Sequence, residues 1–114
     1  MACIFCKIIA HESPAKIFFE DDDIIVFADI YPRAKIHLLV TPKYHCSRIM
    51  DLPDKYTLKI FETIRKITNE LKLQDNFKLV LHNGAKAGQI VEHLHFHYLS
   101  NERSTNINYK EVIT

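Results

Sequence analysis

Residues 83–99 read NGAKAGQIVEHLHFHYL, and this stretch decides the fold. Three histidines alternate here with three large apolar residues, in the order His93, Leu94, His95, Phe96, His97 and Tyr98. Successive side chains of a β-strand point to opposite faces of its sheet. A strand over residues 90–100 would therefore carry three imidazoles on one face and three apolar groups on the other.

This spacing limits how the histidines could share a metal ion. Alternate strand residues are roughly 6.7 Å apart, so His93 and His97 would be about 13 Å apart at Cα. Two neighbours could share a zinc ion, but three could not converge on one ion at a bond length of roughly 2 Å. We expect the histidines to have different roles, one with a ring nitrogen free to attack and another with a ring nitrogen that holds a proton. The alternative is a chance surface cluster, or a partly buried row with ordinary backbone partners.

The two glycines of the chain, Gly84 and Gly88, both precede the histidine row. Glycine permits positive φ and a close approach of the backbone to a ligand. A tight hairpin turn would explain both positions equally well.

Length and composition indicate one globular domain over residues 1–114. The net charge of +1 gives no electrostatic argument for nucleic acid or a membrane surface. The chain has no apolar run of 18 residues, and its first residues do not resemble a secretory signal. Three cysteines, an odd number, argue against a disulfide scaffold. These features favour a cytoplasmic protein.

The patterning predicts an α+β domain with a mainly antiparallel sheet of about five strands. Apolar residues recur at helical spacing after Pro53 and predict one long amphipathic helix, of about five turns, ending near Asp75. Residues 2–10 fit a short N-terminal helix. The expected strands cover residues 15–20, 24–28, 35–41, 77–82 and 90–100.

Several other residues could carry chemistry. Cys3 and Cys6 have the spacing of a zinc half-site, and His45 follows a strand as a third metal ligand of similar softness. His37 lies within an apolar strand, where a lone histidine is more often a satisfied core residue than a catalytic one.

The row from His93 to Leu99 resembles the signature of the histidine triad family, in particular its Hint-like branch. The resemblance covers about residues 3–99, and further matching segments are Ile4–Ile9, Pro14–Ile17, Phe19–Asp22, Phe27–Ile30, His37–His45 and Ala87–Val91. It implies the HIT-like fold and hydrolysis or transfer at the α-phosphate of purine nucleotides, often with an amine as the leaving group.

The resemblance also implies residue roles. His95 would be the nucleophile and form a covalent nucleotidyl intermediate. His97 would contact the phosphate and assist proton movement, and His37 would complete the imidazole relay. Asp29 would bind the ribose hydroxyls. The remaining expected nucleotide contacts are a base pocket of Ile4, Phe5, Ile8, Phe27 and Ile30, and a phosphate region of His82, Gly88, Gln89, Ile90 and Val91.

The same resemblance implies a structural zinc ion bound by Cys3, Cys6, His45 and His93, with no organic cofactor. A closed set of two cysteines and two histidines would hold the N-terminal segment against the sheet. The resemblance alone implies a homodimer, formed through the long helix and a sheet edge.

Two positions depart from the family pattern. His82 stands where the family usually has Asn, and Ile90 stands where it usually has Ser, so one phosphate-region donor is missing. The tail from 101 to 114 matches no family feature. We therefore keep two rivals: a nucleotide-binding regulatory module with little or no turnover, and a zinc-dependent hydrolase that uses the triad as ligands.

Overall fold

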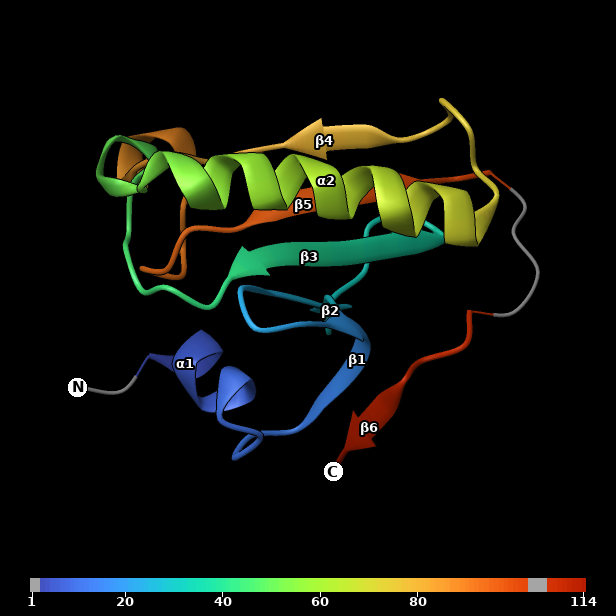
Figure 1. Cartoon of the computed structure of the whole chain (residues 1–114), viewed down its shortest axis with the longest axis horizontal. Helices are drawn as coiled ribbons and strands as arrows, with labels where there is room; N and C mark the ends of the chain where they lie inside the picture. The colour runs from blue at the N-terminus through green and yellow to red at the C-terminus, as the bar shows by residue number, and fades with distance from the viewer. Residues whose placement is uncertain (1–2, 103–106) are drawn as a thin grey trace.

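The computed structural model describes residues 3–102 and 107–114 and has an α+β architecture (Figure 1). Its strands form one antiparallel sheet in the order β4-β5-β3-β2-β1-β6. The elements in chain order are α1 (Ile4–Ile9), β1 (Ala15–Glu20), β2 (Ile24–Ala28), β3 (Ile36–Pro42), α2 (Asp54–Leu71), β4 (Lys78–Val80), β5 (Phe96–Ser100) and β6 (Glu111–Ile113). Short 3-10 helices cover Ile49–Asp51 and Ala85–Ala87.

Helix α2 covers one face of the sheet. Its buried residues recur at helical spacing and include Ile60, Ile64 and Ile67, which join Leu38 and Tyr98 in the larger hydrophobic cluster. The helix ends at Leu71 because Lys72 takes a left-handed conformation, with φ of 59°. It is therefore shorter than the sequence predicted at its C-terminal end.

The opposite face of the sheet carries the smaller hydrophobic cluster and α1. Phe5 and Ile8 of α1 pack there with Ile25, Phe27 and Leu39. Phe5 and Phe27 meet edge to face, with ring centroids 5.2 Å apart. We call this the open face, because α2 lies on the other side of the sheet.

The histidine strand is shorter than predicted. Strand β5 begins at Phe96, so His93 and His95 precede it rather than lying within a strand from 90 to 100. Main-chain groups near these residues bond outside the sheet ladder: for example, Leu94 N donates to the Cys46 carbonyl at 2.8 Å. The predicted alternation of faces still holds, since Leu94, Phe96 and Tyr98 all enter the cluster beneath α2.

The C-terminal tail supplies a sixth strand that the sequence did not predict. Strand β6 pairs antiparallel with β1, at the far end of the sheet from β4 (Figure 1). Lys110 N donates to the Ile17 carbonyl at 2.7 Å, and Ile113 packs against the smaller cluster. The tail thus covers the edge of β1 that would otherwise be unpaired.

The other predicted boundaries differ by a few residues. The strand expected over 77–82 is limited to β4, and α1 covers the inner part of the expected segment 2–10, of which residue 2 lies outside the described residues. No helix among the described residues has the length and apolarity needed to cross a membrane.

Candidate active site and metal centre

Main-chain hydrogen bonds determine which nitrogen of His95 carries the proton. His95 Nδ1 lies 2.7 Å from the carbonyl oxygen of His93, which can only accept a hydrogen bond. Nδ1 must therefore be protonated, and Nε2 of the neutral ring keeps its lone pair. The ring is buried and packs edge to face against Phe5, with centroids 4.9 Å apart. This is the protonation state that a nucleophilic imidazole requires.

His37 and His97 form a second, connected pair. Arg33 N donates to His37 Nδ1 at 3.1 Å, so the proton of His37 lies on Nε2. That N–H faces His97 Nδ1 at 2.9 Å and, less closely, Asp29 Oδ2 at 3.4 Å. His97 Nδ1 therefore accepts, and the neutral ring of His97 holds its own proton on Nε2.

The rings in this row are held in the neutral state by burial. The pKa of His97 is lowered to about 4, mainly by burial and in addition by neighbouring His95, His37 and His82 and by Arg33. Burial is also the main cause that lowers the pKa of His37 and of His95, although Asp29 opposes it at both. At neutral pH the row therefore consists of uncharged imidazoles with defined tautomers.

His93 belongs to a different group, together with Cys3, Cys6 and His45. Its Nε2 donates to the Pro42 carbonyl at 2.8 Å, which leaves Nδ1 with a lone pair. That nitrogen lies 3.4 Å from Cys3 Sγ, 3.7 Å from Cys6 Sγ and 3.0 Å from His45 Nδ1. All four potential ligand atoms lie within 4.8 Å of one another, so these residues could hold a metal ion.

The spacing of this cluster fits tetrahedral zinc. Bond lengths of about 2.0 Å to nitrogen and 2.3 Å to sulfur place two nitrogens roughly 3.3 Å apart, and nitrogen and sulfur roughly 3.5 Å apart. The nitrogen pair here is 3.0 Å apart, and three of the four nitrogen–sulfur distances range from 3.3 to 3.7 Å. Without a cation, burial and Cys3 raise the pKa of Cys6 to about 11, so a metal would be needed to stabilise the thiolate.

Hydrogen bonds of the Gln89 side chain hold the loop between β4 and β5 in place. Gln89 Oε1 accepts from Gly84 N at 2.8 Å and from Arg48 Nη1 at 3.1 Å, and Nε2 donates to the Ser47 and Val91 carbonyls. All four hydrogen-bonding positions of this buried amide are thus used within the protein. The main-chain N–H of Gln89 is used as well, because it donates to the Gly84 carbonyl at 3.1 Å.

His82 lies against the histidine row from the side of this loop. Its Nδ1 donates to the Ala87 carbonyl at 2.8 Å, and its ring meets His97 edge to face at 5.2 Å. Gly88 has φ of 98°, and a Cβ there would lie 3.0 Å from His82 Nδ1, so the turn requires glycine. Ile90 is 91% exposed, consistent with a side chain that offers no polar contact.

The structure brings together part of the expected base pocket. Phe5, Ile8 and Phe27 share one buried cluster on the open face, and Val91 packs against it. Ile30 and Ile4 are instead 77% and 44% exposed. Asp29, expected at the ribose, also faces His37 through Oδ2 and accepts from Tyr31 N through Oδ1.

Sequence reasoning missed three residues that orient the site. Arg33 and Pro42 act through main-chain groups that fix the tautomers of His37 and His93, and every residue type has such groups. Arg48 supports Gln89 and pairs with Glu92 at 3.0 Å. Of the three, only Arg48 acts through its side chain, so only its residue type could have indicated a role beside the loop that contains Gln89.

The lowered pKa of His97 predicts its titration behaviour. Between about pH 6.5 and pH 4 the unfolded chain takes up a proton at this residue that the native protein does not. The contribution of His97 to the free energy of unfolding should therefore decrease as the pH falls through this window. NMR of the His97 ring should show a neutral imidazole down to about pH 5, and an inflection near 6.5 would contradict the assignment.

Comparison with known proteins agrees with this geometry. The family model described as HIT domain matches residues 10–104. An uncharacterized HIT-like protein of Methanocaldococcus jannaschii is 43% identical over 85% of this chain and 77% of its own length. The adenosine 5′-monophosphoramidase HNT1 of Candida albicans is 37% identical over 86% of this chain and 69% of its own length.

Solved structures show the same fold. A histidine triad protein from Clostridium difficile has a TM-score of 0.83 and 38% identity, covering 95% of this chain and 97% of that one. A zinc-bound histidine triad family protein from Mycobacterium smegmatis has a TM-score of 0.80 and 28% identity, covering 95% of this chain and 81% of that one. With the family model matching most of its length, this chain belongs to the HIT, or histidine triad, family.

Proposed function

We propose that this protein hydrolyses purine nucleoside phosphoramidates or related nucleotidyl conjugates at the α-phosphate, with His95 as the nucleophile. The observation that carries the proposal is the 2.7 Å hydrogen bond from His95 Nδ1 to the His93 carbonyl. It leaves Nε2 unprotonated at neutral pH, within a buried row whose other members are also neutral.

In the proposed reaction, His95 Nε2 attacks the α-phosphorus while the bond to the leaving amine breaks. The Nε2–H of His97 contacts the phosphate and supplies the proton with which the amine departs, and the N–H of His37 orients His97 from behind. Water then adds to phosphorus as the bond between phosphorus and His95 Nε2 breaks, and its proton passes to His97 Nε2. The nucleotide is released and both imidazoles are neutral again. The main-chain N–H groups of Ile90 and Val91 would face the phosphate, because that of Gln89 already donates to the Gly84 carbonyl at 3.1 Å.

The base and ribose contacts follow from the surroundings of His95. The cluster of Phe5, Ile8 and Phe27 offers an apolar surface beside this ring, suited to the face of a purine. Asp29 follows the last residue of β2 and would accept hydrogen bonds from the ribose hydroxyls. The named phosphoramidase among the relatives supports the adenosine substrate class.

A nucleotide-binding module with little turnover is the second candidate. The exposed Ile90 favours it, because isoleucine cannot supply the side-chain donor that the family usually has after Gln89. His82 partly offsets that loss by adding an imidazole to the phosphate side of the row.

The first test measures AMP release from adenosine 5′-phosphoramidate. His95→Ala removes the attacking nitrogen, so we expect kcat/KM to fall by roughly 10³-fold or more. His11→Ala is the matched control, because His11 is exposed and pairs with Glu20 away from the row. Release by wild type and the control, but not by His95→Ala, is the expected result.

Two other results would count against the hydrolase. Equal release by wild type and His95→Ala would exclude His95 as the nucleophile. Binding of AMP without release by any variant would favour the binding module, and Ile90→Ser would then test whether the missing donor limits turnover.

We also propose that Cys3, Cys6, His45 and His93 bind a structural zinc ion. The zinc-bound relative supports this, as does the tetrahedral spacing of the four ligand atoms. Four protein ligands close the coordination shell, so the ion has no open position for a substrate. A second group close enough to hold a metal consists of Asp29, His37 and His97. In this group, however, the His37 N–H already donates a hydrogen bond to the lone pair of His97 Nδ1.

Metal analysis tests this assignment. Wild-type protein should hold about one zinc ion per chain, and Cys6→Ser should lose the ion and unfold at a lower temperature. Cys46→Ala is the control, because Cys46 is buried in the cluster beneath α2 and outside the ligand group. If chelation abolished turnover while the fold stayed intact by circular dichroism, a catalytic role for the metal would replace the structural one.

The surface is compatible with the homodimer that the family resemblance implies. Leu58 and Phe61 of α2 are 64% and 44% exposed, and β4 ends the sheet of the described residues. We propose that a second copy covers these two features.

A further inference from the structure

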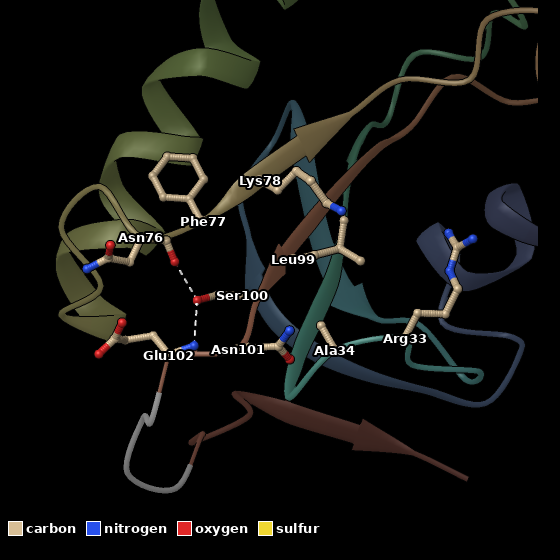
Figure 2. Close-up of a pocket in the computed structure, with 9 residues that line it drawn as sticks. All are labelled: Arg33, Ala34, Asn76, Phe77, Lys78, Leu99, Ser100, Asn101 and Glu102. Atoms are coloured by element: carbon tan, nitrogen blue, oxygen red, sulfur yellow. Dashed lines mark hydrogen bonds between the residues drawn. The ribbon is translucent and has the colours of Figure 1, made fainter.

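A cavity of about 480 Å³ opens where the C-terminal end of β5 meets β4 and the loop before β3 (Figure 2). Figure 2 shows Leu99 near its centre, with Lys78 of β4 above and Arg33 of the loop to one side. The residues that line it are Arg33, Ala34, Asn76, Phe77, Lys78, Leu99, Ser100, Asn101 and Glu102.

The strand register places this cavity directly beside the histidine relay. Leu99 of β5 pairs with Lys78 of β4 on one side and with His37 of β3 on the other. His97 lies two residues before Leu99, so both side chains are on the open face, roughly 6.7 Å apart along the strand. A short chain that leaves a phosphate at His97 in the direction of Leu99 would reach the cavity.

The charge of the lining is predominantly positive. Neither Arg33 nor Lys78 forms an ion pair with any carboxylate in the part of the chain that the structure describes. Glu102 is the one acidic residue among the lining residues. The two cations are thus not neutralised within the protein and remain available to an anion.

The polar side chains nearby differ in what they can offer. Ser100 Oγ is already used, because it donates to the Asn76 carbonyl and accepts from Glu102 N (Figure 2). Asn101 accepts from Lys35 N through Oδ1 at 3.1 Å, which directs its remaining hydrogen-bonding group, the NH₂, to donate. The Asn101 NH₂ group therefore adds a hydrogen-bond donor beside the two cations.

We propose that this cavity is a leaving-group subsite that selects substrates whose departing amine carries an anionic group, held by Arg33 and Lys78. The inference rests on the proposed function and adds the substrate class. The anion could be a carboxylate, as in an amino acid, or a phosphate, and both bind cationic side chains through charge-assisted hydrogen bonds. The chemical step remains attack by His95 Nε2, with the acidic amine departing.

The electrostatics of the relay support the same placement. Arg33 contributes to the lowered pKa of both His37 and His97, which puts its positive charge within range of the reacting groups. An anion bound beside Arg33 would therefore lie close to the phosphate without touching His95.

Three adenosine 5′-phosphoramidates whose amines share a two-carbon spacer test the subsite. Their amines are β-alaninamide, which is neutral, β-alanine, which adds a carboxylate, and phosphoethanolamine, which adds a phosphate. The measured quantity is the kcat/KM of each acidic substrate divided by that of the neutral one. Wild-type protein should give a ratio above one for at least one acidic substrate, decreasing as salt is added.

Lys78→Gln should reduce that ratio about fivefold, the upper end for one solvent-exposed ion pair. Adding Arg33→Gln should bring the ratio close to one. Lys59→Gln is the matched control: it makes the same charge change on α2, across the sheet from the cavity, and should leave the ratio unchanged.

Each outcome has a definite meaning. A preference for the carboxylate, the phosphate or both, lost in Lys78→Gln, supports the subsite and identifies the anion. Hydrolysis of all three substrates with equal kcat/KM overturns the subsite and leaves the proposed function intact. Failure to hydrolyse any of the three, while AMP is still released from adenosine 5′-phosphoramidate, overturns the subsite alone. Failure to release AMP from that substrate as well overturns the proposed function and the subsite with it. A ratio changed equally by Lys59→Gln and Lys78→Gln would show a long-range charge effect and overturn the subsite.

Discussion

The hydrogen bond from His95 Nδ1 to the carbonyl of His93 determines what the rest of the site can do. Because a carbonyl can only accept, the bond fixes one tautomer and leaves Nε2 with its lone pair. The same principle applies to His37, whose Nδ1 accepts from Arg33 N, and to His93, whose Nε2 donates to the Pro42 carbonyl. The main chain thus fixes the tautomers of His95, His37 and His93, and burial keeps the row neutral.

These main-chain groups are positioned by the packing of both faces of the sheet. The cluster beneath α2 holds Leu94, Phe96 and Tyr98, so the histidines between them must face the other way. On the open face, α1 places Phe5 against His95 and brings Cys3 and Cys6 to His93. A metal in that cluster would therefore stabilise the position of α1. It would also stabilise the backbone of His93, whose carbonyl accepts the hydrogen bond from His95.

The sequence predicted the features that depend on side-chain periodicity. Alternation of histidine and apolar residues predicted their opposite faces, and the spacing of apolar residues predicted α2. The grouping of Cys3, Cys6, His45 and His93 was implied by the family resemblance, and the geometry brings the four together. Predictions of this kind succeed because the residue types themselves carry the signal.

What could not be predicted depends on main-chain contacts and on distant segments. The late start of β5 follows from hydrogen bonds around His93 and Leu94 that leave no trace in residue type. Strand β6 has only three residues, and its partner β1 lies about a hundred residues earlier in the chain. The roles of Arg33 and Pro42 are carried by backbone atoms. The cavity beside Lys78 and Arg33 could not be predicted either, because its position depends on the register of β4, β5 and β3.

The most direct measurement is nitrogen-15 NMR of the imidazole rings in the native protein near neutral pH. We expect His95 to carry its proton on Nδ1 and to have an unprotonated Nε2, while His37 carries its proton on Nε2. A protonated Nε2 on His95 would exclude it as the nucleophile, because the nitrogen proposed to attack phosphorus would then have no lone pair to donate.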